Sequence, residues 1–175
     1  MLLGKILKNS SVYLRDLLIS DVSIEYINWL NNPSVNKYMD VRFKPPSLDE
    51  QVAYVNECIT SSNKVILGIF TLEDRLIGTL KLTYLDSRNI EIGIMIGDQT
   101  MQGKGYGKSA IQLIKKWAKS NGISFLHAGY LSENIRSMKL FESTGFIEIK
   151  SKLVEKVGEK TSNVCRVKLE LNDVC

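Results

Sequence analysis

The sequence has few of the residues that build metal sites and disulfides. Its 175 residues include one histidine, His127, and three cysteines, Cys58, Cys165 and Cys175. Three cysteines cannot all pair with one another, and no two of them have the spacing of a zinc ligand pair. A zinc site is therefore close to excluded, and a Ser-His-Asp hydrolase would need its nucleophile beside His127. We expect no metal and reduced, free thiols, as in a cytosolic protein.

Long hydrophobic runs and a strong charge of one sign are also missing. The longest apolar stretches, at residues 65–70 and 92–96, are far shorter than the roughly 20 residues that span a bilayer. The apolar run in residues 1–8 is too short for the core of a signal peptide. The net charge of +4 is too small to indicate nucleic-acid binding. We therefore expect a cytoplasmic location, with neither a membrane nor a nucleic acid as partner.

What the sequence does contain is the composition of a globular domain. Hydrophobic residues make up 44% and charged residues 24% of the chain, close to the globular average, which predicts one domain over residues 1–175. Three β-prone runs at 65–71, 75–85 and 90–96 are separated by two short turns, which predicts an antiparallel meander. Helical patterns lie on both sides of these runs in the sequence. We expect a mixed α/β (α+β) protein with a mostly antiparallel central sheet flanked by helices.

Capping residues and further apolar runs predict the remaining helices and strands. Ser20 and Asp21 predict the cap of the first helix. Ser47 and Glu50 form a capping-box pattern, which predicts a helix over residues 48–60. The other expected elements are a strand at 12–14, a helix from the loop at 102–107 to residue 119, a strand at 125–130, a helix capped by Asn134, and closing strands at 146–154 and 164–171 joined by a polar loop at 155–163.

The loop of residues 102–109, Gln-Gly-Lys-Gly-Tyr-Gly-Lys-Ser, carries the most chemical information. Glycines allow positive φ angles and a close approach of the backbone to a ligand, and amides at a helix N-terminus favour anions. The loop is thus a candidate phosphate-binding site. A Walker A loop would need glycine in place of Gln102, and a dinucleotide fingerprint would need glycine in place of Lys108. A nucleotide-binding protein is disfavoured for this reason, and an ordinary glycine turn at the surface stays the alternative.

Together with three other segments, this loop resembles the GCN5-related N-acetyltransferases (GNAT). The pattern Gln-x-x-Gly-x-Gly at residues 102–107 is similar to the family's acetyl-CoA loop. Residues 134–146 are similar to its later helix, Asn-x-x-Ser-x-x-x-x-Glu-x-x-Gly-Phe. Glu-Ile-Gly at 91–93 lies on the strand before the loop, as in the family. The opening at 14–33 resembles the subgroup of ribosomal-protein N-terminal acetyltransferases.

The resemblance implies an acetyl-CoA-dependent N-acetyltransferase with the GNAT fold. In the family, the loop amides hold the pyrophosphate of coenzyme A, and the strand before the loop binds the pantetheine arm and supplies an N–H to the oxyanion. Asn134 would bind the cofactor arm, although its position as an N-cap is an alternative explanation. The residues implied in cofactor binding are Ile94, Met95, Ile96, Gln102, Gly103, Lys104, Gly105, Tyr106, Gly107, Lys108 and Asn134.

Two residues are implied in catalysis. Glu91 is the candidate base that takes a proton from the attacking amine, and its alternative is an ordinary strand glutamate. Ser137 could contact the coenzyme or protonate the departing thiolate, and its alternative is helix-capping chemistry. Phe141 stands where many family members have a tyrosine acid. Another donor, such as Ser137, water or Tyr130, would then serve, or none is needed because a thiolate is a good leaving group.

The acceptor is expected to be a small amine such as an amino-sugar nucleotide. Residues 128–142 resemble members that acetylate amino sugars of surface polysaccharides. A protein N-terminus, as in ribosomal-protein modification, is one alternative, and a non-catalytic acyl-CoA-binding module is another. Trp29 and Tyr38 lie in the region that forms the family's acceptor side, although core packing also explains them. Dimerisation is common in the family, so a homodimer is one option.

Other polar residues are expected to be structural. A lone histidine within a strand, such as His127, is more often hydrogen-bonded than catalytic. Lys115, Lys116 and Lys119 are expected to form a solvated helix face.

Overall fold

One sheet organises the computed structural model, which describes the backbone of residues 1–157 and 160–171 and the side chains of residues 1–149 and 163–171. In these residues the strand order is β1-β2-β3-β4-β5-β6-β8-β7, and every neighbouring pair is antiparallel except the parallel pair β5 and β6. This confirms the mixed, mostly antiparallel sheet. The strands are β1 (Leu7–Lys8), β2 (Tyr13–Asp16), β3 (Lys64–Phe70), β4 (Leu76–Tyr84), β5 (Asn89–Ile96), β6 (Phe125–Leu131), β7 (Ile147–Val157) and β8 (Lys160–Glu170).

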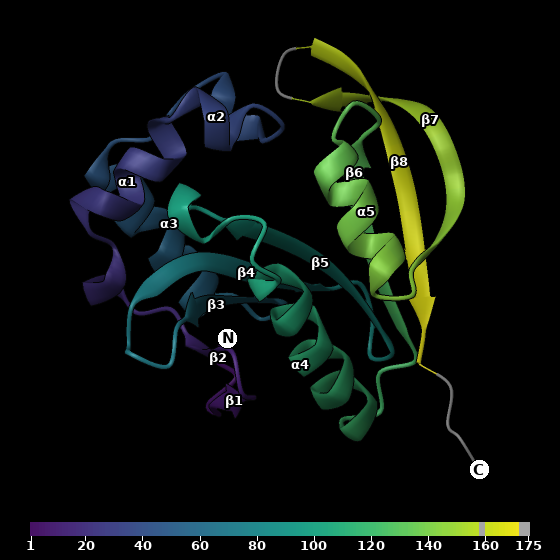
Figure 1. Cartoon of the computed structure of the whole chain (residues 1–175), viewed down its shortest axis with the longest axis horizontal. Coiled ribbons are helices and arrows are strands. Elements are labelled where there is room, and N and C mark those ends of the chain that lie inside the picture. Colours follow the sequence, from purple (N-terminus) through teal and green to yellow (C-terminus); the bar gives the residue numbers. More distant parts are fainter. Residues whose placement is uncertain (158–159, 172–175) are drawn as a thin grey trace.

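Helices cover both faces of the sheet (Figure 1). A cluster of buried side chains that includes Ile111, Ile114 and Phe141 packs α4 and α5 against one face. A second cluster, with Trp29 and Val55, packs α1 and α3 against the other face. The helices are α1 (Ile24–Asn31), α2 (Pro33–Asn36), α3 (Leu48–Thr60), α4 (Tyr106–Ser120) and α5 (Ile135–Ser143), with short 3-10 turns η1 (Ile19–Asp21), η2 (Asp40–Arg42) and η3 (Gln99–Met101).

The elements with strong local signals form as expected. The amide of Glu50 donates to Ser47 Oγ at 3.2 Å, and the amide of Ser47 donates to Glu50 Oε2 at 2.9 Å, so the predicted capping box begins α3. The strands β3, β4 and β5 form the predicted antiparallel meander. Asn134 caps α5, since its Oδ1 accepts from the Ser137 amide at 3.1 Å.

The predicted cap of the first helix is wrong. Ser23 caps α1, and its Oγ accepts from the Tyr26 amide at 3.2 Å. Asp21 cannot serve because its carboxylate accepts from Arg15 at 2.7 and 2.8 Å and from the Leu18 amide at 2.8 Å. A nearby arginine on β2 therefore changes the role of an acidic residue that the local pattern assigned to a cap.

The predicted polar loop at residues 155–163 is also wrong. Strand β7 runs to Val157 and β8 begins at Lys160, with backbone pairs such as Glu155↔Ser162 and Lys156↔Thr161. Figure 1 shows this pair as a long, curved ribbon beside α5. Backbone pairing holds such a ribbon together and does not require apolar side chains, which is why a polar sequence misled the prediction. The two-residue strand β1 has no predicted counterpart because it is too short for a periodic pattern.

The structure bears on the expectations of free thiols and of no membrane partner. Cys58 and Cys165 are buried free cysteines, and Cys175 lies outside the described residues. In the part of the chain that the structure describes, no helix is long and apolar enough to cross a membrane.

Candidate active site

The two parallel strands at the centre of the sheet separate part-way along their length. Pairing between β5 and β6 runs from Asn89↔Phe125 to Glu91↔His127. Beyond that point the described residues of β5 pair only with β4, and those of β6 pair only with β8. The two strands therefore diverge immediately after Glu91.

The backbone of β5 presents polar groups to this divergence. The amide of Gly97 donates to the carbonyl of Ile77 at 2.9 Å, so the odd-numbered residues at this end of β5 turn their peptide groups toward β4. The peptide groups of Ile94 and Ile96 consequently point the other way, into the divergence. Met95 differs from its two neighbours: its peptide group faces β4, and its side chain packs on the cluster under α1 and α3.

The glycine-rich loop ends in a set of backbone amides without acceptors. Gly103 and Gly105 have φ angles of +74° and +87°, a region that favours glycine, and Gly105 is the N-cap of α4. Because this cap has no side chain, the amides of Tyr106, Gly107 and Lys108 donate to no atom of the described residues, and the first closed bond runs from Ser109 to Gly105 at 3.0 Å. These amides sit at the positive end of a 15-residue helix, a favourable place for an anionic group.

The side chain of Gln102 connects the loop to both neighbouring elements. Its Nε2 donates to the carbonyl of Ile96 at 2.8 Å, and its Oε1 accepts from Arg136 Nη1 at 2.8 Å. The loop is thereby tied to the end of β5 and to the first turn of α5. Lys104 and Lys108 are exposed beside it.

Residues of α5 lie on the same side of the sheet as the loop. Leu140 of α5 lies close to Gly107 at the start of α4: a Cβ added to Gly107 would be 3.5 Å from Leu140 Cδ2. Asn134 acts as the N-cap described above, and Ser137 lies half-buried in the first turn. The amide loop, β5 and α5 thus surround the divergence from one side.

Phe141 is a core residue between two other aromatic rings. It is 3% exposed, its ring stacks 6.1 Å from that of Tyr130, and the ring of Phe146 packs edge-on at 5.1 Å. Burial raises the pKa of Tyr130 to about 12, so this hydroxyl stays protonated at neutral pH.

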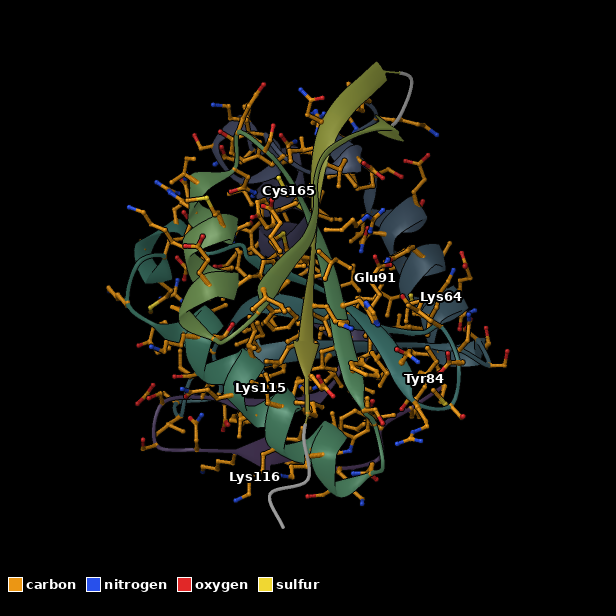
Figure 2. All side chains as sticks on the ribbon, turned by 90° about the vertical axis from the view of Figure 1, so that its right-hand side faces the viewer. Lys64, Tyr84, Glu91, Lys115, Lys116 and Cys165 are labelled. Carbon is orange, nitrogen blue, oxygen red and sulfur yellow. The ribbon has the colours of Figure 1, made fainter. Side chains whose placement is uncertain are left out.

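A cavity of about 360 Å³ lies where β5 and β6 diverge. Glu91 is at its wall, and Figure 2 shows Glu91 on the side of the strands away from Lys115 and Lys116 of α4. The Glu91 Oε1 accepts from Arg166 Nη1 at 2.6 Å. The lining residues are Tyr38, Asp40, Lys81, Thr83, Glu91, Ile92, Gly93, Gly129, Tyr130, Leu131, Val164 and Arg166.

Two further charged side chains lie in the cavity wall, those of Lys81 on β4 and Asp40 at the start of η2. Neither side chain makes a hydrogen bond or ion pair with a described residue, although Lys81, after Lys64, helps to lower the pKa of Glu57. The described lining residues therefore include the ion pair of Glu91 with Arg166 and two further charges of opposite sign.

Several other sequence candidates have structural roles. His127 Nε2 lies 2.9 Å from Asn89 Oδ1, and burial of the ring, with a smaller effect from Lys168, lowers its pKa. Trp29 is a core residue, and its ring fills the space that a Cβ on Gly97 would need. These contacts favour the structural interpretation of both side chains.

The expectation of a solvated lysine face does not hold for Lys115, which is half-buried. Its Nζ donates to the carbonyl of Thr144 at 2.7 Å, so the side chain joins α4 to the end of α5. Helical spacing places a lysine on the outer face but does not show that a neighbouring helix ends beside it.

A family model described as an acetyltransferase (GNAT) domain matches residues 11–147. The chain belongs to the GNAT acetyltransferase family. The matched region contains both the diverging strands and the amide loop.

Relatives of this GNAT chain include one curated protein and many solved structures. An uncharacterized protein of Methanocaldococcus jannaschii is 32% identical over 149 residues, and the match covers 83% of this chain but only 30% of that protein. The chain thus spans about a third of the length of that relative. Spermidine N-acetyltransferase from Vibrio cholerae, solved with CoA and spermine, has a TM-score of 0.79 at 24% identity and covers 93% of this chain and 97% of that one. The Salmonella typhimurium acetyltransferase that modifies the N-terminal serine of ribosomal protein L7/L12 has a TM-score of 0.83 at 17% identity, covering 96% and 100%.

Sequence reasoning missed several charged residues at the site. Lys81, Asp40 and Arg166 come from three distant segments, and none of them belongs to a recognisable motif. A partial signal existed for Lys81. Thr83 pairs with Glu91 across β4 and β5, and Lys81 is two residues from Thr83, so Lys81 lies on the same face of the sheet as Glu91. Arg166 could not be found without the register of β6 and β8. Within the described residues, no group of three histidine, cysteine, aspartate or glutamate side chains could hold a metal ion.

Proposed function

We propose that this chain transfers an acetyl group from acetyl-CoA to the primary amine of a small acceptor, of which an amino-sugar nucleotide is our leading example. The observation that carries the proposal is the position of the divergence between β5 and β6. Unpaired amides of the 102–108 loop lie on one side of it, and the cavity with Glu91 lies on the other. A molecule that passes between the strands would connect an anion site to a carboxylate.

The cofactor would follow this path. The pyrophosphate binds the amides of residues 106–108, with Lys104 and Lys108 beside it. The pantetheine arm hydrogen-bonds the peptide groups of Ile94 and Ile96. Asn134 caps α5 through Oδ1, which leaves its amide nitrogen to donate to the arm.

The chemistry requires a neutral amine at the thioester. An alkylammonium group has a pKa near 10.4, so it must lose a proton before it attacks. Glu91 accepts from Arg166 through Oε1, and its Oε2 takes this proton. The amine nitrogen then bonds to the carbonyl carbon, and an N–H of β5 stabilises the oxyanion. As the C–S bond breaks, the nitrogen loses its second proton, which passes to the departing thiolate through water or Ser137.

A dedicated acid is not required for the leaving group. A thiol has a pKa of about 8.5, so the thiolate departs readily and takes its proton from water or from Ser137. Phe141 therefore does not argue against catalysis. This reasoning favours an enzyme over a non-catalytic acyl-CoA-binding module.

The charges in the cavity favour an acceptor that carries an anionic group as well as an amine. Among the described lining residues, Asp40 and Glu91 balance Lys81 and Arg166, so these residues carry no net charge to attract a polycation such as spermine. Lys81 would hold an anion such as a phosphate, and Asp40 would hold a hydroxyl or ammonium group. An amino-sugar nucleotide meets both conditions.

The test is CoA-thiol release from acetyl-CoA with a panel of acceptors. The panel holds amino-sugar nucleotides, the same sugars without the nucleotide, polyamines, and ribosomal-protein N-terminal peptides. We expect release with the amino-sugar nucleotides and much slower release with the others. Release with peptides alone would support the protein N-terminus instead. Acetyl-CoA binding without release for any acceptor would contradict the proposal and support the binding module.

A further inference from the structure

Arg166 reaches Glu91 from two strands away. It lies on β8, directly opposite Gly129 of β6, and its Nη1 donates to Glu91 Oε1 on β5 at 2.6 Å. The guanidinium therefore crosses β6 at Gly129. It crosses just beyond Glu91↔His127, the last backbone pair between β5 and β6.

Gly129 leaves the space that this crossing needs. A Cβ on Gly129 would lie 2.9 Å from Arg166 Nη1, 3.3 Å from its Cζ and 3.5 Å from its Cδ. The end of the arginine side chain thus rests on the bare backbone of β6. Gly129 has no positive φ angle, so a larger residue there would not strain the backbone. The clash would fall on the flexible end of Arg166.

We propose that Arg166 is the positioning residue for Glu91, and that Gly129 permits it to act. This inference rests on the proposed function, in which Glu91 is the base. The side chain of Glu91 is 37% exposed, and the next residue of β6 on the same face after its pairing partner His127 is Gly129, which has no side chain to hold the carboxylate. The hydrogen bond from Arg166 fixes Oε1 and directs Oε2 into the cavity, where the amine nitrogen lies.

The experiment is a pair of double-mutant cycles on kcat, with CoA affinity measured for every variant. In the first cycle, Arg166→Gln lowers kcat roughly 10- to 100-fold, the effect expected when a reacting group loses its position. In the Glu91→Gln background the same substitution lowers kcat no further, because the group that it positions is gone.

The second cycle tests the glycine. Gly129→Ala displaces the guanidinium and lowers kcat in the wild-type background, but has no further effect in the Arg166→Gln background. Lys168→Gln is the matched control: it removes a cation from the same strand and face, where Lys168 packs on the Phe125 ring. We expect this control to keep the wild-type kcat.

Folding is monitored by thermal unfolding. If Arg166→Gln does not fold, Arg166→Lys and Gly129→Ala carry the test, because both keep the positive charge. The inference is overturned if Arg166→Gln keeps the wild-type kcat, or if its effect and that of Glu91→Gln multiply independently. A wild-type chain that binds acetyl-CoA but acetylates no acceptor would instead overturn the proposed function, and this inference with it.

Discussion

At the scale of the single residue, the position of Phe141 is explained by core packing and not by proton transfer. It is 3% exposed and lies between the rings of Tyr130 and Phe146. Phe141→Ala should lower the free energy of unfolding by about 3–5 kcal/mol, because it leaves a cavity in an aromatic cluster. Chemical denaturation measures this loss. Ile135→Ala, on the same helix but 49% exposed, is the control and should cost much less. Equal losses for the two variants would contradict this account of Phe141.

His127 makes a second prediction for a single residue, one that depends on pH. Burial lowers its pKa in the folded chain, so the folded state binds fewer protons here than the unfolded state. Its contribution to stability is fully present above the ordinary pKa of about 6.5 and is lost as the pH falls toward the folded pKa. Denaturation curves should show wild type losing stability below about pH 6.5 more steeply than His127→Gln. Parallel pH dependences would contradict the shift.

At the scale of the helix or strand, the sequence predicts an element correctly where its signal lies within a few neighbouring residues. The capping box of α3 and the cap of α5 lie within a few residues of the helices they begin, so the sequence contains them whole. The predicted cap of α1 is wrong because Arg15, on another element, binds Asp21. The prediction for β7 and β8 fails because backbone pairing between two strands leaves no apolar pattern in the sequence.

The loop before α4 gives a prediction that separates backbone strain from ligand binding. Gly105 and Gly122 both have positive φ angles, and a Cβ at either would meet nothing within 4 Å. Gly105→Ala and Gly122→Ala should therefore each cost about 1–2 kcal/mol of stability. Only Gly105→Ala should also weaken CoA binding, because it moves the amides that the pyrophosphate needs. Calorimetric titration with CoA checks this, and equal affinities for the two variants would remove the loop from the cofactor site.

The whole molecule brings together segments that no sequence window contains. The loop and the later helix are contiguous motifs, so the resemblance to the GNAT family found them from sequence alone. The cavity instead combines Asp40, Lys81, Glu91 and Arg166 from four separate elements. Only the strand order and register bring these charges to one place, which is why sequence reasoning found Glu91 and missed its partner.

The charge balance of this assembled cavity predicts how the chain selects its acceptor. Lys81→Gln should lower kcat/KM for an anionic amine roughly 10- to 100-fold, the range expected for a lost charge-assisted hydrogen bond. Steady-state kinetics with an amino-sugar nucleotide measures the effect. Lys116→Gln, on the exposed face of α4, is the control and should leave kcat/KM unchanged. An unchanged kcat/KM in Lys81→Gln would exclude this lysine from acceptor recognition.

The most direct test of the account compares acetyl transfer by wild type and Glu91→Gln, with CoA affinity measured on the same preparations. The account predicts a fall in kcat of about 100-fold or more, the scale of a lost general base, with CoA affinity unchanged. A variant that keeps the wild-type kcat would contradict it, because Glu91 could not then be the group that takes the proton from the amine.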